Sequence, residues 1–158
     1  MKILYLLRHA EAESKISKED HNRALTENGE SQARSLSKRL NGTKNLFDKI
    51  LCSSSRRTKK TCSILLEELD ISIKPQIKQS LYNPSIEDFL ANIEQLEDNI
   101  NSVLIVSHNP AISDFYNFLS SSLGQLIYFS PCNMVKLTLN IDSWEEIGQN
   151  CAIEIQRL

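Results

Sequence analysis

LYLLRHAEAE, residues Leu4 to Glu13, joins a run of apolar residues to an Arg-His pair and then to two carboxylates. A short, continuous apolar run is typical of a strand that is buried on both faces of a sheet. Such a strand usually ends in a turn residue, whereas this one ends in Arg8 and His9, two side chains that bind anions. Because ligands bind at the carboxyl ends of the strands in open α/β sheets, this stretch predicts a functional site directly after the first strand.

The whole chain alternates short apolar runs with segments of helical spacing. The expected strands cover residues 3–7, 48–52, 71–73, 103–106, 135–141 and 153–155, and the apolar stripes of the expected helices cover 33–40, 62–69, 86–96 and 112–119. The third strand is expected to end at Pro75. Apolar and polar residues alternate in the last two strands, which predicts an antiparallel pair. This order predicts an α/β fold with a mostly parallel sheet, formed by residues 1–158 as a single domain.

Three of the expected helices carry capping residues at their starts. Thr26 is an N-cap candidate for the first helix, and Ser85 with Asp88 three residues later fits a capping box. Asn109 followed by Pro110 is typical of an N-cap and the first residue of a helix. The fourth helix is therefore expected to begin at Pro110.

Composition narrows the class of protein. Hydrophobic residues make up 41% and charged residues 24% of the 158 residues, as in an ordinary globular protein. A net charge of -2 argues against a dedicated nucleic-acid binder, because neutralising phosphates requires clustered Lys and Arg. The dense basic cluster in the chain is local and consists of Arg56, Arg57, Lys59 and Lys60.

The four cysteines are expected to be reduced core residues. No pair among Cys52, Cys62, Cys132 and Cys151 has the C-x-x-C spacing of a zinc or dithiol site. The apolar run before Arg8 is too short for a secretory signal, and no other run is long enough to span a bilayer. A cytoplasmic protein without a membrane partner is the expectation.

Three strand ends carry residues that suit phosphate chemistry: Arg8-His9, the segment from Ser53 to Arg57, and Ser107-His108. Two guanidinium groups can each form a bidentate pair of hydrogen bonds with phosphate oxygens. One neutral imidazole can act as a nucleophile and a second can donate a hydrogen bond, while the helix that begins near Asn109 adds its positive end. Phosphoryl transfer needs little beyond positioning and charge stabilisation. The set predicts a phosphatase that works through phosphohistidine, without a metal or any other cofactor.

At these motifs the chain resembles the histidine phosphatase superfamily, whose members include phosphoglycerate mutase-like enzymes. The matching stretches are Leu7-Arg8-His9-Ala10-Glu11, Arg23 to Gly29 with Gln32-Ala33, Ser53 to Thr61, and Ser107-His108-Asn109-Pro110. The resemblance covers Met1 to about Leu119, with Lys60 in a position where the family usually has glutamine. It implies a three-layer α/β/α fold of the phosphoglycerate mutase type.

The resemblance also implies roles for individual residues. His9 would be the phosphorylated nucleophile, and Arg8, Arg57 and His108 would hold the phosphate. The spacing of the second arginine motif to Thr61 selects Arg57 over its neighbour.

Three further residues are candidates for the site. Asn109 is included among the phosphate-binding candidates. Arg23 either borders the phosphate pocket or only pairs with an acid. Glu11 either belongs with Glu13 to a solvated turn or orients His9 and tunes its pKa.

The substrate class depends on whether a general acid is present, because an alkoxide leaves poorly without a proton. The segment from Leu81 to Ser85, where the family usually carries that acid, contains none, and Glu87 and Asp88 fit the first turn of a helix. The short chain and the missing acid favour the SixA-type phosphohistidine phosphatases. The expected substrate is a phosphohistidine on a protein, with a histidine-containing phosphotransfer domain as the partner that the family implies.

Other functions remain open at this point. A small-molecule phosphomonoesterase of the same superfamily is the nearest alternative, and a non-catalytic phosphate- or phosphopeptide-binding module is another. A metal hydrolase would have to use the ligand set His9, Glu11, Glu13, His21 and His108. A cysteine phosphatase fails on spacing, because Thr58 and not an arginine stands at the Cys-x5-Arg distance from Cys52.

Overall fold

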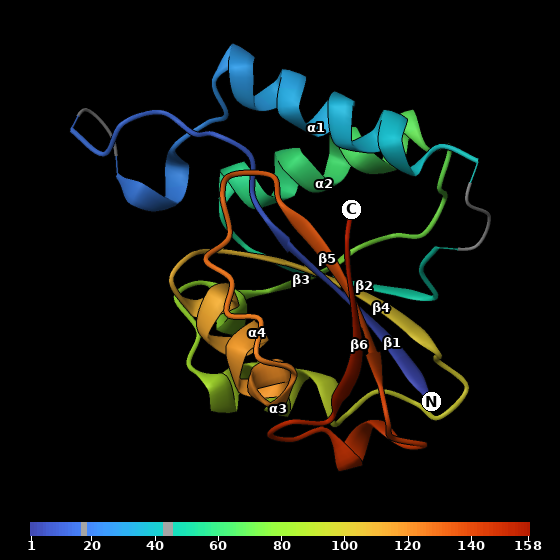
Figure 1. Ribbon diagram of the computed structural model, residues 1–158. Helices are drawn as coiled ribbons and strands as arrows, with labels where there is room; N and C mark the ends of the chain where they lie inside the picture. The colour runs from blue at the N-terminus through green and yellow to red at the C-terminus, as the bar shows by residue number, and fades with distance from the viewer. Residues whose placement is uncertain (17–18, 43–45) are drawn as a thin grey trace.

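The computed structural model describes residues 1–16, 19–42 and 46–158 (Figure 1). Its strands are β1 (Lys2–Arg8), β2 (Lys49–Ser53), β3 (Gln76–Lys78), β4 (Ser102–Ser107), β5 (Met134–Leu139) and β6 (Ala152–Arg157). Its α-helices are α1 (Glu27–Leu40), α2 (Arg56–Glu68), α3 (Ile86–Ile93) and α4 (Ala111–Ser120). Short 3-10 helices are η1 (Asp20–Asn22), η2 (Gln79–Leu81), η3 (Ser121–Leu123) and η4 (Trp144–Glu146). No helix in these ranges is long and apolar enough to cross a membrane.

The six strands form one sheet in the order β3-β2-β4-β1-β5-β6. β1, β2, β3 and β4 run parallel, β5 is antiparallel to β1, and β6 is antiparallel to β5. The prediction of a mostly parallel sheet that ends in two antiparallel strands is confirmed.

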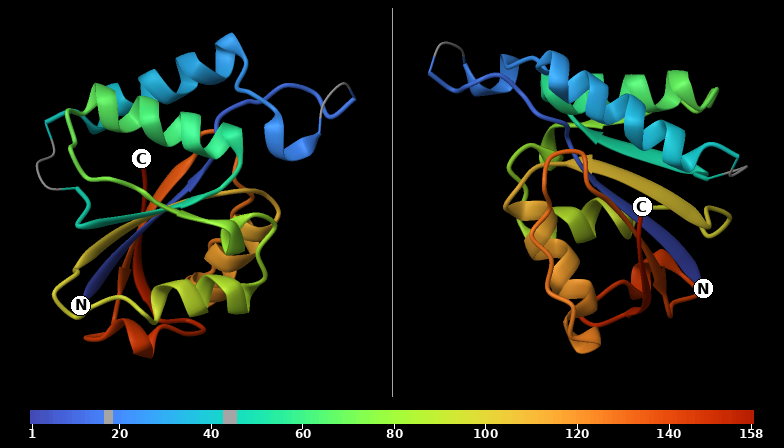
Figure 2. Two further views of the ribbon diagram at one scale, coloured as in Figure 1. Left: turned by 180° about the vertical axis from the view of Figure 1, so that it is seen from behind. Right: turned by 45° about the horizontal axis from the view of Figure 1, so that its top comes forward.

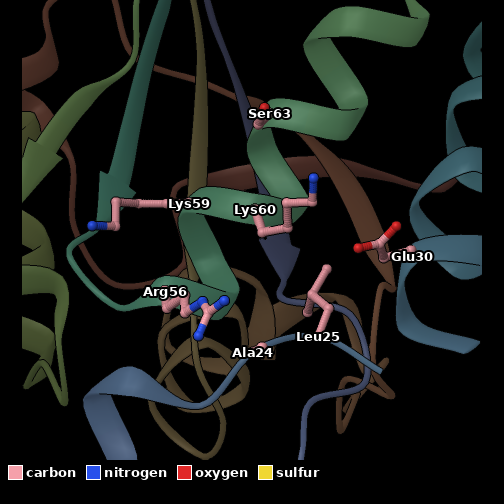
Figure 3. Close-up of a pocket in the computed structure, with 7 residues that line it drawn as sticks. All are labelled: Ala24, Leu25, Glu30, Arg56, Lys59, Lys60 and Ser63. Atoms are coloured by element: carbon pink, nitrogen blue, oxygen red, sulfur yellow. The ribbon is translucent and has the colours of Figure 1, made fainter. Parts of the chain in front are cut away.

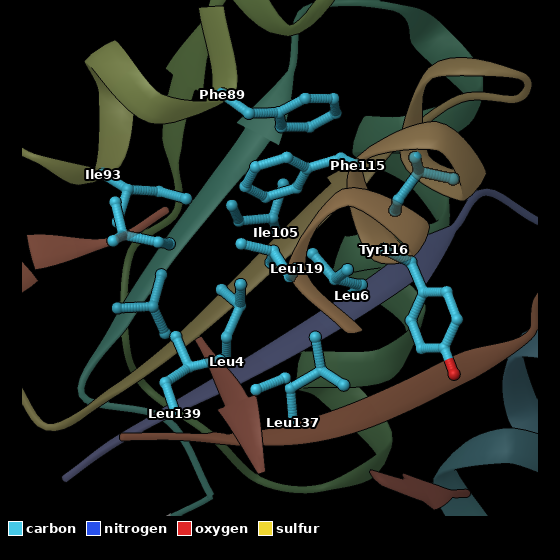
Figure 4. Packing of buried hydrophobic residues seen from close by; sticks show 14 of the residues in the cluster. Leu4, Leu6, Phe89, Ile93, Ile105, Phe115, Tyr116, Leu119, Leu137 and Leu139 are labelled. Atoms are coloured by element: carbon cyan, nitrogen blue, oxygen red, sulfur yellow. The ribbon is translucent and has the colours of Figure 1, made fainter. Parts of the chain in front are cut away.

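Helices cover both faces of the sheet, with α1 and α2 on one side and α3 and α4 on the other (Figures 1 and 2). Alternate residues of β1 therefore enter different cores: Leu4 and Leu6 pack with α3 and α4, whereas Tyr5 and Leu7 pack with α1 and α2. In the first core the ring of Phe89 on α3 stacks on that of Phe115 on α4, with centroids 4.4 Å apart, and Leu4 and Leu6 lie beneath them (Figure 4). This three-layer α/β/α arrangement is the predicted fold class.

Local sequence explains where most helices begin. The Thr26 side chain accepts a hydrogen bond from the backbone of Gly29, and Ser85 forms the reciprocal capping box with Asp88. Ser55 caps α2 by accepting from the backbone of Thr58. These caps satisfy backbone N–H groups that have no partner inside a helix.

The third strand lies after Pro75, not before it, so the predicted strand at 71–73 is wrong. Residues 76–78 pair with β2, with Leu51 opposite Gln76. Ile71 and Ile73 are half-buried and pack on the core beneath α1 and α2 without joining the sheet. Their alternation reflects contact with that core, which a loop can make as well as a strand.

The predicted start of the fourth helix is also corrected. α4 begins at Ala111, Pro110 occupies the N-cap position, and the Asn109–Pro110 peptide is cis. The Asn109 side chain does not cap the helix; it donates to the carbonyl of Phe129 and accepts from the Ser113 hydroxyl. It therefore ties the start of α4 to the segment that precedes β5.

Gly29 sits where α1 meets the backbone that leaves β1. A Cβ added at this buried position would overlap the carbonyl oxygen of Glu11. That carbonyl also accepts from the backbone N–H of Thr26 at 3.1 Å, so it is not free to move aside.

We therefore expect Gly29→Ala to lower the free energy of unfolding by about 1–3 kcal/mol, the usual cost of overpacking, despite the better helix propensity of alanine. Urea unfolding followed by circular dichroism measures the change. Gly148→Ala is the matched control, because the nearest atom to its added Cβ is 4.0 Å away. Equal stability of the two variants would contradict the packing argument.

Candidate active site

The carboxyl ends of β1, β2 and β4 lie side by side, as the strand register requires. Arg8 is paired with Ser107, and Cys52 with Val106. The residues that follow these positions are therefore neighbours in space. The structure brings together His9 after β1, Arg57 in the first turn of α2, and His108 after β4.

His9 is buried, and its hydrogen bonds define its tautomer. Its Nδ1 atom lies 2.7 Å from the carbonyl oxygen of Ala10. Since a carbonyl only accepts, Nδ1 carries the proton and Nε2 keeps its lone pair. The Nε–H of Arg57 donates to that Nε2 atom at 3.2 Å.

His108 faces His9, with ring centroids 5.3 Å apart. A guanidinium only donates, so the Nη2 of Arg57, 3.1 Å from Nδ1 of His108, makes that nitrogen the acceptor. The opposite nitrogen, Nε2, is then protonated and donates to the hydroxyl of Ser53 at 2.7 Å. Both imidazoles thus direct a lone pair at one guanidinium.

Asp20 balances the charge of Arg57, which is only 4% exposed. Nη1 of Arg57 donates to the backbone carbonyl of Asp20 at 2.6 Å, and Nη2 lies 3.1 Å from its carboxylate. The same carboxylate accepts from the hydroxyl of Tyr82 at 2.6 Å and from Nε of Arg23 at 3.1 Å. Sequence analysis missed Asp20, although its position three residues before Arg23 on one turn was a detectable sign of an ion pair.

Arg23, for which two places were open, pairs with an acid and lies beside the site at the same time. Its guanidinium contacts Asp20 and also donates to the carbonyl of Glu13 at 2.6 Å. It reaches the pocket through Asp20 and contributes to the positive potential around His9.

Arg8 and Asn109 share one acceptor, the carbonyl of Phe129. Nη1 of Arg8 donates to it at 2.7 Å, and the side-chain amide of Asn109 at 2.6 Å. The Nε–H of Arg8 is buried and has no hydrogen-bond partner among the described residues. A buried, unpaired donor of this kind is suited to an incoming anion.

A cavity of about 280 Å³ opens beside Arg57, His108 and Asn109. Its described lining consists of Lys15, Asp20, Arg57, Tyr82, Asn83, His108 and Asn109. Asp20 is the single carboxylate in that set, so the cavity is dominated by groups that attract anions.

Burial and neighbouring charges shift the titration of the acid–base groups. Burial, aided by the guanidiniums of Arg57 and Arg8, lowers the pKa of His9 to about 4. Burial and then Arg57 lower the pKa of His108 to about 3. For Asp20, burial acts to raise the pKa, but the Tyr82 hydroxyl and the guanidiniums of Arg57 and Arg23 outweigh it and hold the pKa well below its usual range. At neutral pH the site therefore contains two neutral imidazoles and one ionised carboxylate.

The carboxylate of Glu11 binds residues at the start of α1 rather than His9. Its carboxylate accepts from the Thr26 hydroxyl at 2.6 Å and from the Asn28 amide at 3.0 Å. The ring of His9 is oriented instead by the Ala10 carbonyl and by Arg57. Of the two roles left open for Glu11, these contacts disfavour the one in which it orients His9.

The ligand set of the metal-hydrolase alternative is not gathered in one place. His21 bonds to the hydroxyl of Ser54, and Glu11 is turned to α1. Across residues 1–16, 19–42 and 46–158, no three His, Cys, Asp or Glu side chains are grouped as a metal site requires.

The four thiols are free and lie outside the phosphate pocket. A hydrogen bond with Cys62, together with burial, raises the pKa of Cys52 well above its usual value. Burial raises the pKa of Cys132 to about 11 and also raises that of Cys151. Cys52, Cys132 and Cys151 are therefore protonated at neutral pH.

Comparison with known proteins decides the family. The family model of the histidine phosphatase superfamily (branch 1) matches residues 4–82, half of the chain. The chain belongs to the histidine phosphatase superfamily. It is a phosphatase.

Solved structures show the same fold over nearly the whole of this histidine phosphatase. A protein from Nakamurella multipartitia assigned as the phosphohistidine phosphatase SixA is 25% identical, with 98% of this chain and 95% of that chain covered and a TM-score of 0.78. The protein histidine phosphatase SixA in complex with tungstate is 21% identical over 98% and 96% of the two chains, with a TM-score of 0.81. A protein assigned as an α-ribazole-5'-phosphate phosphatase from Escherichia coli is 20% identical over 90% and 93%, with a TM-score of 0.72.

The lowered pKa values of His9 and His108 predict a specific titration. Both imidazoles should stay neutral down to about pH 4 and about pH 3, respectively. Because an unfolded histidine titrates near 6.5, the free energy of unfolding should fall as the pH drops from about 6.5 towards 4, where only the unfolded chain takes up these protons. Nitrogen-15 NMR of the imidazole rings measures both titrations, with His9→Asn and His108→Asn to assign the signals.

Adding tungstate, a phosphate-like dianion, should raise both pKa values, because a bound anion favours the imidazolium. Rings that titrate near 6.5 in the free protein, or that ignore the dianion, would contradict this account of the site.

Proposed function

We propose that this phosphatase hydrolyses phosphohistidine on a protein through a covalent intermediate at His9. The observation that carries the proposal is the state of Asp20. It is the one carboxylate in the described lining of the pocket, and its pKa is held well below its usual range by Tyr82, Arg57 and Arg23. An ionised carboxylate has no proton to give, so the described lining offers no carboxylic acid to protonate an alkoxide leaving group.

His9 has the properties that the first step needs. Its imidazole is neutral at physiological pH, and the Ala10 carbonyl holds the proton on Nδ1. The lone pair of Nε2 attacks the phosphorus atom, and a bond forms between Nε2 and phosphorus while the bond from phosphorus to the substrate's nitrogen breaks. Arg57 donates to Nε2 in the resting site, so the phosphoryl oxygens must first take over that N–H.

The leaving group needs little help. The electron pair of the broken bond goes to the ring nitrogen of the substrate. When the other ring nitrogen of the phosphohistidine already carries a proton, the group leaves as a neutral imidazole. An alkoxide, in contrast, requires a general acid. Water then attacks the phosphorus of phosphorylated His9, which releases inorganic phosphate and restores the Nε2 lone pair.

We assign to three groups the stabilisation of the transferring phosphoryl group. Arg57 and Arg8 supply N–H donors, including the unpaired Nε–H of Arg8. His108 becomes a donor through Nδ1 once the dianion raises its pKa and the ring takes up a proton. Charge stabilisation by preorganised donors is the main requirement of phosphoryl transfer.

Two exposed apolar side chains near Phe129 in the sequence also suit contact with a protein substrate. Leu126 and Tyr128 are 74% and 71% exposed in the segment just before Phe129, whose carbonyl binds Arg8. Exposed apolar and aromatic side chains next to a catalytic pocket are typical of protein contact surfaces. We propose that residues 1–158 act as one catalytic unit on such a partner.

His9→Ala should abolish turnover, with a loss of at least about a thousandfold, because the nucleophile is removed. Both proteins are assayed in EDTA on free phosphohistidine, on a phosphohistidine-bearing protein and on a panel of phosphate monoesters. Release of phosphate by the wild type alone, fastest from phosphohistidine, supports the proposal. A preference for one of the esters would favour a small-molecule phosphomonoesterase, and phosphopeptide binding without any turnover would favour a non-catalytic module.

Arg57→Ala and Arg56→Ala form a matched pair of neighbouring residues. Arg57 is buried in the site, whereas Arg56 is exposed. On free phosphohistidine, Arg57→Ala should lower kcat/KM by about 10²–10³-fold, the usual effect of losing one preorganised donor, and Arg56→Ala should leave it within about twofold. Equal losses in the two variants would overturn the assignment of Arg57.

A further inference from the structure

The basic cluster of α2 is only partly explained by catalysis. Arg57 faces the phosphate pocket, whereas Arg56, Lys59 and Lys60 are exposed. Arg56 and Lys60 are four residues apart, so they lie on the same side of the helix, and Ser63 continues that side. This row of cations lies roughly a quarter turn around the helix from the catalytic arginine.

These side chains border a groove of about 500 Å³, which we name the α2 groove. Its lining includes Arg56, Lys59, Lys60 and Ser63 of α2, Leu25, and Glu30 of α1. Figure 3 shows Lys60 and Arg56 on α2, with Leu25 and Glu30 on the facing segments, while Lys59 extends away from Lys60 and Glu30. Arg56 and Lys60 are therefore the cations best placed to hold a ligand in it.

The positive charge of the groove is not neutralised by the protein. Glu30 is the carboxylate of the described lining, and it is already engaged with Arg34 at 3.2 Å. Within the described residues, no ion pair joins an acid to Arg56, Lys59 or Lys60.

The position of these cations is unfavourable for the helix itself. They occupy the first turns of α2, whose first turn has no acidic residue. The start of a helix carries a partial positive charge and prefers anions, so cations there cost stability. Residues that break such a local rule are concentrated at functional sites. The charge of these exposed side chains therefore favours an anionic ligand.

The groove lies next to the catalytic pocket. Arg56 precedes Arg57 in the first turn of α2, and Leu25 follows two residues after Arg23, which binds Asp20 in the pocket. A small phosphate ester would fill the pocket alone. A ligand that reaches the pocket and the groove at once must be larger and must carry a second negative group.

We infer that the α2 groove binds acidic side chains of the phosphorylated protein, close to its phosphohistidine. This inference rests on the proposed function and names the surface chemistry of the substrate. Carboxylates next to the phosphohistidine would meet Arg56 and Lys60 while the phosphoryl group enters between His9 and Arg57. Charge complementarity of this kind chiefly raises the rate of encounter and selects the partner.

The test compares two phosphohistidine peptides that differ only in flanking residues, glutamates in one and glutamines in the other, with free phosphohistidine as the small substrate. The wild type should show a kcat/KM about three- to tenfold higher for the glutamate peptide at low salt, and little preference at about 0.5 M salt, where exposed charges are screened.

Lys60→Gln should reduce this preference, and Arg56→Gln/Lys60→Gln should remove it, while hydrolysis of free phosphohistidine stays unchanged. Lys74→Gln, which removes an exposed lysine outside the groove, is the matched control and should keep the preference. Thermal unfolding separates binding from a structural role, because removing cations from the start of α2 should leave the melting temperature equal or higher.

Three results would overturn the inference: no preference in the wild type, a preference that survives in the double variant, or a loss shared by Lys74→Gln. Each of these requires that the phosphohistidine substrates are hydrolysed. If none of them is hydrolysed, the proposed function fails first and the inference fails with it.

Discussion

The structure of the site depends on how one buried guanidinium is balanced. Arg57 is almost fully buried, and an unpaired charge in the interior would cost several kcal/mol. Asp20 compensates it with both its backbone carbonyl and its carboxylate. The remaining N–H groups of Arg57 point at His9 and His108. Burial, and then the charge of Arg57, lower the pKa of both imidazoles and keep their lone pairs available. The Arg57–Asp20 ion pair and the burial of the two imidazoles together set the protonation of the pocket.

In the resting site, the protein itself supplies the hydrogen-bond partners of Arg57. Each nitrogen of the Arg57 guanidinium donates a hydrogen bond to a group of the protein. An entering phosphoryl group must therefore replace some of these acceptors. Such an exchange is favourable for a dianion, which interacts more strongly with a guanidinium than a neutral imidazole does. A neutral ligand of the same shape would gain nothing from it. The pocket therefore discriminates by the charge of the ligand more strongly than by the group attached to the phosphate.

Much of this could be predicted from the sequence, because it follows from periodicity and capping. The buried runs that became β1, β2 and β4 were visible as apolar stretches, and the strand ends brought His9, Arg57 and His108 together as parallel pairing requires. The features that could not be predicted lie in segments without a periodic pattern of apolar residues. Asp20 sits on a short 3-10 turn, and its contacts with Arg57 and Tyr82 span 37 and 62 residues. The displacement of β3 and the partner of Asn109 were missed for the same reason, since both are set by tertiary packing.

The protonated cysteines have a consequence for chemical durability. Oxidants attack the thiolate, and the raised pKa values of Cys52, Cys132 and Cys151 leave little of it at neutral pH. Cys52, Cys62 and Cys132 are also buried. The groups that would carry phosphoryl transfer are imidazoles and guanidiniums, which peroxide leaves intact under conditions that convert a reactive cysteine to its sulfenic acid. A phosphatase built in this way should remain active under oxidative stress that inactivates enzymes with a thiolate nucleophile.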